Sequence, residues 1–464
     1  MSRIKLFGNN RTPPRYLQRE RPYRRAAAVV EEDDDEEDDE YEEEYARSPL
    51  KPIAIILVIL AVIEALYFVC VYSNIPFIER YRNIYIQTAM STMRHRWLAT
   101  AFIPSPVINE VMEGLADARA AQIGHESSWH TDDDPKEDTK NPDKKPVKPV
   151  QTVVSSVDTA PTLTPEQQAE QDFYNLFWEV DQETLNDYIK EHPEALDNGW
   201  DGLYINEAGL DDNGTSIRTI MDEQVLAIDA PNQILIVRVE GTAAGGRYQG
   251  VLAVAKDPSR LSVKNSESMW AGQYAQTIAN NNNGVLALTA SAFIDDGGNG
   301  NGGSIAGFSM SDGEGRGYHM GWGYKRLELR ENNYMYITDA QSPVHEDTTD
   351  AVEFQPALIV DGEKIDDWMV NYYSDVNPRT VIGQSDLGEV LMLAIEGRMP
   401  ARSMGCAVKE CAEIMSRHNC MQALNLDGGS STIMWYDGEY LIRCSNRYAE
   451  GRQLPNAFIY ERRE

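Results

Sequence analysis

The sequence predicts an α/β domain (α+β, with a mixed sheet) that contains at least one βαβ unit. A single transmembrane helix and a disordered acidic tail are predicted to precede this domain. Short β-rich runs separated by Gly, Pro and Asn fill much of the chain after Gly214. A strand–helix–strand pattern lies between Val390 and Asp427. Near the N-terminus, Ile53 to Tyr72 form a nearly continuous apolar run, about long enough to cross a bilayer.

The composition limits the classes of partner. The chain has 464 residues, with 42 Lys and Arg against 74 Asp and Glu, and a net charge of −32. A hydrophobic fraction of 42% is enough for a large core, so wholesale disorder is excluded. The negative charge argues against a nucleic-acid partner, which needs clustered Lys and Arg. Because residues 1–51 carry only −4 of the charge, the folded part is itself acidic. A site for an anionic substrate must then be a local basic pocket.

Residues 1–51 are predicted to form a solvated tail, because 13 of the 14 residues from Glu31 to Glu44 are acidic and repel one another. Residues 52–73 are predicted to form an uncleaved membrane anchor, since the run is too long and too far from the N-terminus for a signal peptide. Its one charge, Glu64, is either protonated or buried against another helix. The arginines of the tail favour a cytoplasmic N-terminus at the cell membrane, which leaves the C-terminal domain extracellular.

Three segments follow the anchor. Residues 74–124 are expected to form a juxtamembrane helical region, with Val107, Val111 and Leu115 at helical spacing, that packs against the membrane or the main domain. Residues 125–164 have the Pro-, Lys- and Asp-rich composition of a linker. The main domain covers 165–464 and begins with two short helices, the first capped by Thr164. Farther on, the strand from Val390 and the strand ending at Asp427 are expected to pair in parallel.

Candidate chemistry concentrates in the last hundred residues. Residues 425–432 read Asn-Leu-Asp-Gly-Gly-Ser-Ser-Thr and follow a strand, and strand ends are where α/β sheets place ligands. The glycine amides and serine hydroxyls can hold an anion beside the Asp427 carboxylate. Taken alone, the motif is also typical of a tight polar turn.

Two other segments supply charge near the same place. Arg379 precedes a strand, and Glu396 and Arg398 end the strand expected to run parallel to the one that ends at Asp427. If those strands are neighbours, two carboxylates and two guanidinium groups share one sheet edge, and arginine binds phosphate oxygens well. The alternative is a set of salt bridges that only holds the edge together.

Five motifs in order resemble the phosphodiester glycosidase family: NPRTVIGQ, LMLAIEGR, a helix containing AEIM, ALNLDGGSSTIMWYDG and GRQLPNAFIY. The resemblance is clear over about residues 351–460 and weaker back to about residue 215. Many bacterial members of the family are associated with exopolysaccharide. The resemblance implies a hydrolase of sugar 1-phosphodiester bonds whose substrate is a glycan.

The resemblance also implies roles for individual residues. Asp427 and Glu396 are the implied catalytic residues, with Glu396 standing where the family has Asp. Thr289 stands where the family usually has Asn, a departure that bears on substrate preference and on activity. The implied substrate- and phosphate-binding residues are Arg379, Thr380, Arg398, Asn425, Gly428, Gly429, Ser430, Ser431, Arg452 and Asn456.

The expected mechanism follows from the leaving group. A phosphate monoester leaves readily, so the site needs charge stabilisation more than a strong general acid. Asp427 is then the nucleophile or the base for water, and Glu396 is a second carboxylate or orients an arginine. Retention and inversion both stay open. No cofactor is expected. Ca²⁺ at the acidic, glycine-rich loop from Asp295 to Gly303 is the alternative, although this loop lacks the standard calcium-loop spacing.

Three functional hypotheses stay open. The first is a membrane-anchored, extracellular hydrolase of sugar 1-phosphodiester bonds on cell-surface glycans or exopolysaccharide. The second is a non-catalytic glycan-binding or exopolysaccharide or wall assembly protein, motivated by Thr289. The third is a glycosyl transferase with an acceptor other than water. Outside the cell, Cys406, Cys411, Cys420 and Cys444 can form up to two disulfides in three pairings, with Cys406 and Cys411 expected to share a helix that makes their direct pairing awkward.

Overall fold

The computed structural model of the chain describes residues 50–92, 95–129, 163–210, 213–268, 270–295, 300–365, 372–446 and 450–463. The predicted tail with its acidic run, most of the predicted linker and part of the Asp295–Gly303 loop lie outside these residues. The chain divides into two compact units, residues 1–63 and residues 64–464.

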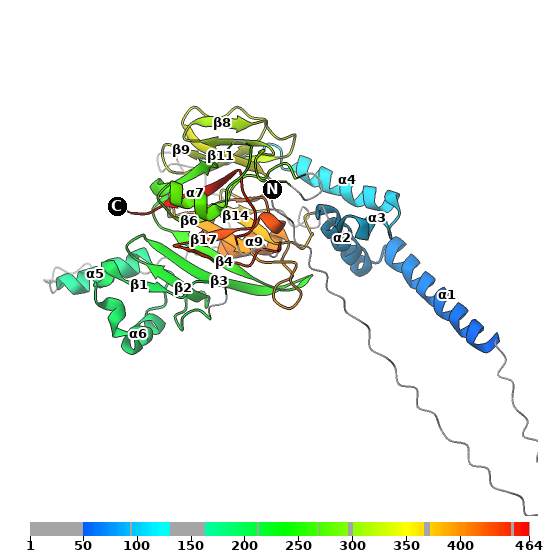
Figure 1. Ribbon diagram of the computed structural model, residues 1–464, viewed down its shortest axis with the longest axis horizontal. Coiled ribbons are helices and arrows are strands. Elements are labelled where there is room, and N and C mark those ends of the chain that lie inside the picture. The colour runs from blue at the N-terminus through cyan, green and yellow to red at the C-terminus, as the bar shows by residue number, and fades with distance from the viewer. Residues whose placement is uncertain are drawn as a thin grey trace, which may run out of the picture. The chain divides into compact units, whose positions relative to one another are not determined.

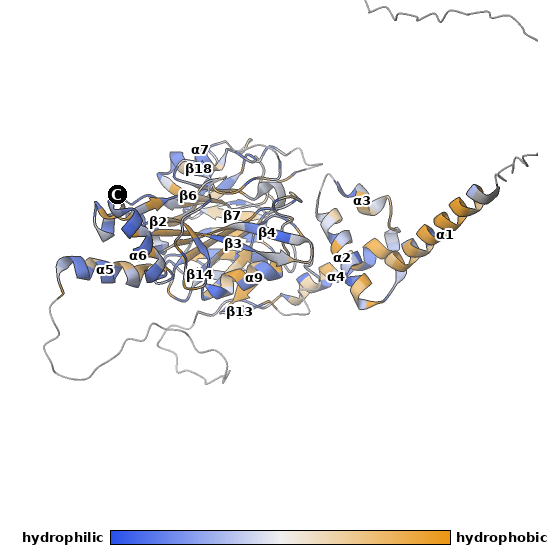
Figure 2. Cartoon of the chain, turned by 90° about the horizontal axis from the view of Figure 1, so that it is seen from below, coloured by the Kyte–Doolittle hydropathy of each residue, from blue (hydrophilic) through white to orange (hydrophobic). Residues whose placement is uncertain are grey.

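The apolar run forms helix α1, Leu50–Tyr72. Its side chains are almost all exposed, and Figure 2 shows the helix as hydrophobic along most of its length. Within the part of the chain that the structure describes, α1 is the one helix long and apolar enough to cross a membrane. Uniform apolar character around a helix, without a protein core against it, is what a lipid environment favours.

The segment after α1 contains three helices, α2 (Pro76–Ser91), α3 (Trp97–Thr100) and α4 (Ser105–Ala121). Proline near the start of α2 and of α4 suits the first turn, where the backbone N–H has no helical partner. The inner faces of these helices form one small apolar cluster that includes Val71 at the end of α1 and Ile86 and Val111. The prediction of helices in this segment therefore holds.

The main domain begins with α5 (Pro165–Leu176) and α6 (Gln182–Glu191). Thr164 forms a capping box with Gln167, whose backbone N–H lies 3.2 Å from the threonine Oγ1. Two further α-helices, α7 (Ala275–Asn281) and α9 (Val408–Arg417), lie against the sheets described below. Short 3-10 helices include η3 (Trp200–Gly202) and η6 (Gly429–Ser431).

A nine-stranded sheet forms the centre of the domain, in the order β1-β2-β3-β4-β15-β14-β16-β12-β13 (Figure 1). In the same order, its strands are β1 (Tyr204–Asn206), β2 (Gln224–Asp229), β3 (Ile234–Ala243), β4 (Gly246–Ala255), β15 (Val390–Ile395), β14 (Arg379–Ser385), β16 (Cys420–Asn425), β12 (Ala357–Val360) and β13 (Glu363–Lys364). Every pairing along this order is antiparallel.

Two five-stranded sheets complete the domain. One has the order β10-β9-β11-β7-β8, with β10 (Met335–Asp339), β9 (Lys325–Arg330), β11 (Thr348–Phe354), β7 (Phe308–Ser311) and β8 (Glu314–Gly317). The other has the order β18-β17-β6-β19-β5, with β18 (Glu439–Tyr440), β17 (Met434–Tyr436), β6 (Gly284–Thr289), β19 (Asn456–Glu461) and β5 (Leu261–Asn265).

The layers follow from the burial of the sheets. One face of the nine-stranded sheet packs on α9, α5 and α6 through a cluster that contains Phe177, Leu393 and Ile414. The other face meets both five-stranded sheets in a second cluster. All residues of β14 and β15 are buried, as expected for strands covered on both sides.

The predicted direct pairing of the two strands around α9 is wrong. β14 lies between β15 and β16 and pairs antiparallel with each. β15 and β16 therefore run in the same direction, as a βαβ crossover requires, but they are not neighbours. The sequence pattern indicates how long the crossover is. It does not indicate that another strand lies between the two strands that the crossover connects.

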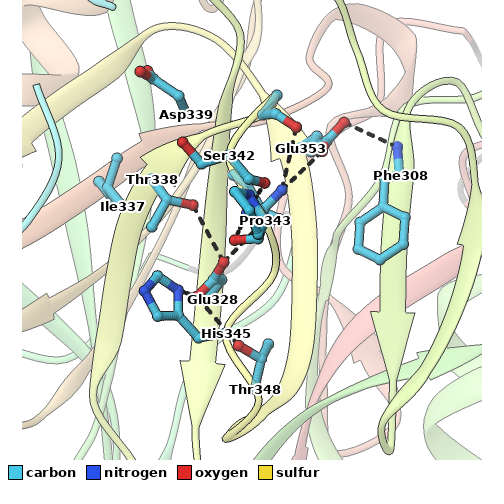
Figure 3. Close-up of polar contacts among 12 residues, drawn as sticks. Phe308, Glu328, Ile337, Thr338, Asp339, Ser342, Pro343, His345, Thr348 and Glu353 are labelled. Carbon is cyan, nitrogen blue, oxygen red and sulfur yellow. Dashed lines mark hydrogen bonds and ion pairs between the residues drawn. The ribbon is translucent and has the colours of Figure 1, made fainter. Parts of the chain in front are cut away.

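The sheet that contains β9, β10 and β11 encloses a buried ionic cluster, defined here as Arg326, Glu328 and Glu353 (Figure 3). Arg326 Nε donates to Glu328 at 2.9 Å, and its Nη1 lies 3.6 Å from Glu353. Hydroxyls of Thr338 and Thr348 also donate to Glu328. Burial is the largest effect on Glu328 and disfavours its charge, but Arg326, His345 and Arg330 together outweigh it and lower the pKa of this carboxyl group.

Candidate functional site

The candidate site lies at one edge of the nine-stranded sheet. Because β14 is antiparallel to both neighbours, its first residue lies beside their last residues: Arg379 pairs with Ile395, and Val381 pairs with Asn425. The segments that carry Arg398 and Asp427 leave the sheet at this same edge.

Asp427 follows β16 and is partly exposed. Burial raises its pKa to about 6, against the opposing effects of a hydrogen bond from Ser431, the charge of Arg452 and the Gly428 amide. In the described part of the chain, no cation lies within salt-bridge distance of this carboxylate. A partly exposed carboxyl group with a raised pKa, among other polar groups, is a candidate base or nucleophile.

Arg398 lies in the left-handed backbone region, with φ of 61°, which a non-glycine residue adopts at a cost. Its Nη2 and Nε donate to Asn377 Oδ1 at 2.7 and 3.3 Å. Burial and then repulsion from Arg379 lower the pKa of this guanidinium, while the carboxylate of Asp427 acts in the opposite direction. No carboxylate of the described residues lies within 4.0 Å of it. This cation therefore has capacity for a bound anion.

Arg379 is more fully engaged. Its Nη2 lies 3.1 Å from Asp375 Oδ1, and its Nε donates to the Cys406 carbonyl at 3.0 Å. Although burial opposes ionisation, the Arg379 charge lowers the pKa of Asp375. The Arg379–Asp375 pair is therefore close to neutral, and Arg379 acts on the site mainly by holding residues 375–377 and by repelling Arg398.

Asn377 joins these charges to helix α2. Its Nδ2 donates to Ser91 at 2.9 Å and to Asp375 at 2.6 Å, while its Oδ1 accepts from Arg398. The preceding residues are also held by α2, because Gln87 accepts from the Ser374 amide and Thr88 from the Val376 amide, each at 3.0 Å. α2 therefore fixes the loop that positions Arg398.

Arg452 lies on the other side of Asp427. Its Nη1 lies 2.6 Å from Asp295 Oδ2 and 3.4 Å from Ser430 Oγ, and its Nη2 donates to the Gly300 carbonyl at 2.8 Å. Its guanidinium also covers the ring of Phe293, 4.5 Å from the centroid. Arg452 thus connects the glycine-rich turn to the loop that begins at Asp295.

Glu396 is buried and does not face Asp427 as a second open carboxylate. Arg402 binds both of its oxygens, Gln249 donates to Oε2 at 3.2 Å, and the Arg443 amide donates to Oε1 at 2.7 Å. Of the two roles left open for Glu396, this geometry favours orientation of an arginine. That arginine is Arg402, which sequence reasoning had not singled out.

Gly428 and Gly429 mainly allow close packing, because their backbone amides already have acceptors and are not free to bind a ligand. The Gly429 amide donates to the Pro378 carbonyl at 3.0 Å, and the Gly428 amide acts on Asp427. A Cβ at Gly428 would meet the Pro378 oxygen at 2.5 Å, and one at Gly429 would lie 3.0 Å from Arg398. Gly429 also has a φ of 63°. Any side chain here would displace Arg398 or distort the turn.

The remaining predicted residues are buried supports. Thr289 Oγ1 donates to the Ser431 carbonyl at 2.5 Å, so the residue that departs from the family pattern holds the turn. Asn456 accepts from the Ser291 amide and donates to Ser309, and Asn425 Nδ2 donates to the Gln355 carbonyl. Buried Thr380 Oγ1 and Asn425 Oδ1 have no hydrogen-bond partner in the described chain.

Asp375 and Asn377 were also not predicted as site residues from the sequence. Asn377 stands inside the NPRTVIGQ motif, next but one to Arg379, and that proximity was the available signal. Asp375 lies outside the motif, and only the fold shows that it pairs with Arg379. Cys406 precedes α9 and does not share the helix with Cys411, and the two sulfurs lie 3.6 Å apart, so the expectation for this pair is wrong. Within the described ranges, no group of three or more His, Cys, Asp or Glu side chains is arranged so that it could hold a metal ion.

Residues 282–461 match the phosphodiester glycosidase family model. The resemblance inferred from the motifs is therefore confirmed over this segment. Curated protein sequences contain no significant match to the chain.

Solved structures with similarity to the chain include three that share 13–16% sequence identity. The zebrafish N-acetylglucosamine-1-phosphodiester α-N-acetylglucosaminidase catalytic domain, auto-inhibited by its pro-peptide, is 16% identical with a TM-score of 0.42, over 50% of this chain and 83% of that one. A Synechocystis hypothetical protein is 15% identical with a TM-score of 0.35, over 52% and 65%. A Burkholderia pseudomallei exported protein is 13% identical with a TM-score of 0.35, over 47% and 76%.

Proposed function

We propose, from the match of residues 282–461 to the phosphodiester glycosidase family, that this chain hydrolyses sugar 1-phosphodiester bonds in cell-surface glycans or exopolysaccharide. The observation that carries the proposal is the meeting of Asp427 with Arg398 at one sheet edge. One side chain is a carboxylate with a raised pKa, and the other is a guanidinium without a carboxylate partner in the described chain. A substrate with an anomeric carbon next to a phosphodiester fits this pair.

Arg398 is assigned to the departing phosphate. Its guanidinium keeps donors beyond those used by Asn377, and charge-assisted bonds to phosphate are strong. Ser430 and Arg452 flank Asp427 on the other side and suit the sugar hydroxyls or the second phosphate ester. Because the leaving group is a phosphate monoester, charge stabilisation can replace a strong general acid.

Asp427 is assigned to the anomeric carbon, as the nucleophile or as the base that takes a proton from water. Glu396 is bound on both oxygens by Arg402, so we assign it to positioning and not to proton transfer. A single reacting carboxylate is chemically sufficient when the leaving group needs little protonation.

The proposed location is the cell membrane. Helix α1 is assigned as a single-pass anchor, with the N-terminus cytoplasmic and residues 73–464 extracellular. In this topology the domain acts on glycans outside the cell.

The test uses the full chain, purified in detergent, with a panel of N-acetylglucosamine 1-phosphodiesters. Release of the free sugar by the wild type and its loss in Asp427→Asn are expected. Binding of the same compounds without release of sugar would refute hydrolysis. It would support the second candidate, a glycan-binding protein. The sequestered Glu396 favours that candidate, because a site with two working carboxylates is incomplete here.

A further inference from the structure

An exposed aromatic surface surrounds the end of α1. We define the juxtamembrane aromatic surface as Tyr72, Phe77, Tyr81, Tyr85, Trp97 and Phe102. Their exposed fractions range from 43% to 70%. Phe77, Tyr81 and Tyr85 are four residues apart and so lie along one side of α2. Large apolar side chains gathered in this way in a soluble region mark an interaction surface.

The helices that carry this surface fold back onto α1. The Tyr67 hydroxyl donates to the Phe102 carbonyl at 2.9 Å, and Tyr67 lies inside the apolar run, five residues before its end. Arg82 donates to the carbonyls of Val71 and Ser73 and thereby satisfies the last turn of α1. Phe102 therefore lies level with the last turns of the apolar helix.

The charge of the same segment is opposite to that of the chain. Residues 73–104 contain four arginines and one glutamate, a formal charge of +3, in a chain of −32. Arg80 and Arg96 are exposed. Aromatic rings together with arginines at the end of an apolar helix are the pattern of a membrane interface, and anionic lipid attracts such a segment.

We propose that the juxtamembrane aromatic surface lies in the headgroup region of an anionic bilayer, in the leaflet where α1 ends. The proposal rests on α1 as the membrane anchor, which is part of the proposed function. Charge complementarity and the continuity with α1 select lipid over a second copy of this acidic chain. The rest of the domain is repelled by the same lipid, so the contact is confined to α2 and α3.

The proposed lipid contact fixes the position of the candidate site relative to the membrane surface. The last turns of α2 hold the loop at residues 374–377 through Gln87, Thr88 and Ser91, and Asn377 of this loop holds Arg398. The sheet edge near Arg398 and Asp427 is thus fixed to α2, the helix proposed to lie on the lipid. Glycans carried at the membrane surface are the favoured substrates.

The experiment places the full chain, one molecule per disc, in lipid nanodiscs of brominated phosphatidylcholine with about 30% phosphatidylglycerol. Brominated acyl chains quench only tryptophans that reach the lipid. Wild type is compared with Trp97→Phe and with the control Trp322→Phe, whose indole is 72% exposed on the main domain. We expect the bromolipid-quenched fluorescence to fall by more than half in Trp97→Phe and to stay unchanged in Trp322→Phe.

A charge variant gives an independent readout. In Arg80→Gln/Arg96→Gln, the quenching of Trp97 in anionic discs should drop to the level of discs made of phosphatidylcholine alone. Quenching of Trp97 by aqueous acrylamide but not by bromolipid would overturn the proposal. So would protection of Trp97 from both quenchers in the discs, with protection from acrylamide in detergent only at high protein concentration, which indicates a second copy.

Turnover of a soluble sugar phosphodiester by the same discs separates the two proposals. Turnover with an unquenched Trp97 rejects the lipid contact alone. A quenched Trp97 without turnover rejects hydrolysis alone. Failure of the chain to enter discs rejects both α1 as the anchor and the lipid contact.

Discussion

Two regions of this molecule bring charged side chains together, but only one of them pairs these charges with each other. In the ionic cluster of Arg326, Glu328 and Glu353, the guanidinium lies within 4.0 Å of both carboxylates, and carbonyl and hydroxyl groups complete the bonding (Figure 3). At the sheet edge, Arg398 and Asp427 lie close together, yet neither has an ion-pair partner within that distance in the described chain. Removal of one partner from a buried pair destabilises a fold, whereas a partly exposed charge without an ion-pair partner stays available for a ligand.

The largest expected effect is on catalysis. Asp427→Asn removes the reacting carboxylate and should lower kcat/KM by about a thousandfold or more. Sugar release from an N-acetylglucosamine 1-phosphodiester measures it. Asp312→Asn, which changes an exposed carboxylate paired with Lys264, is the matched control and should retain activity. Retained activity in Asp427→Asn would remove this residue from the mechanism.

The complementary change breaks the paired region. Arg326→Met removes the buried guanidinium that Glu328 and Glu353 share, leaves Glu328 with Arg330, and should lower the free energy of unfolding by about 3–5 kcal/mol. Chemical denaturation measures the loss. Arg247→Met, which breaks an exposed pair with Glu240, should cost less than about 1 kcal/mol. Equal stabilities of these two variants would contradict the distinction between the regions.

Arg398→Gln tests the unpaired cation. Loss of a charged donor to phosphate should lower kcat/KM by about 10- to 100-fold, because such bonds contribute about 1.5–3 kcal/mol. The melting temperature should stay the same or rise, since a partly buried cation without a carboxylate partner in the described chain is removed. A large fall in stability instead would show that Arg398 resembles Arg326.

The pH dependence sharpens the contrast at Asp427. With its pKa at about 6, the ionised form falls about tenfold between pH 7 and pH 5, and kcat/KM should fall with it. The contribution of Asp427 to the free energy of unfolding changes with pH in the opposite direction to kcat/KM. A carboxyl group whose pKa is raised on folding favours the folded state below pH 3.8 and loses that contribution as the pH rises to about 6. Above pH 6, Asp427→Asn should therefore melt at a higher temperature than the wild type.

The smallest expected effect is on positioning. Asn377→Ala frees the Arg398 guanidinium from its acceptor and should lower kcat/KM about tenfold, without loss of the fold. Asn377→Asp should not recover the loss, because its carboxylate would pair with Arg398 and lie against the carboxylate of Asp375. An effect confined to thermal stability would make Asn377 structural only.

Several features follow from the sequence because they depend on local chemistry. The apolar run that forms α1, the capping box at Thr164 and the helices after the anchor all come from neighbouring residues. The ordered motifs identify the phosphodiester glycosidase segment for a related reason: a Cβ at residue 428 would lie only 2.5 Å from the Pro378 oxygen, so this position favours glycine. Local constraints of this kind leave a readable pattern.

Other features were decided only by the tertiary structure. β14 inserts between β15 and β16, and its pairing with β15 brings Asn377, which precedes β14, to Arg398, which follows β15. Two residues of the same charge type, Arg379 and Arg398, thus differ because one meets a carboxylate and the other meets an amide. Even partners only 4 to 21 residues apart are chosen by the way the loops at this sheet edge pack, so the sequence alone cannot state which charge is left for a ligand.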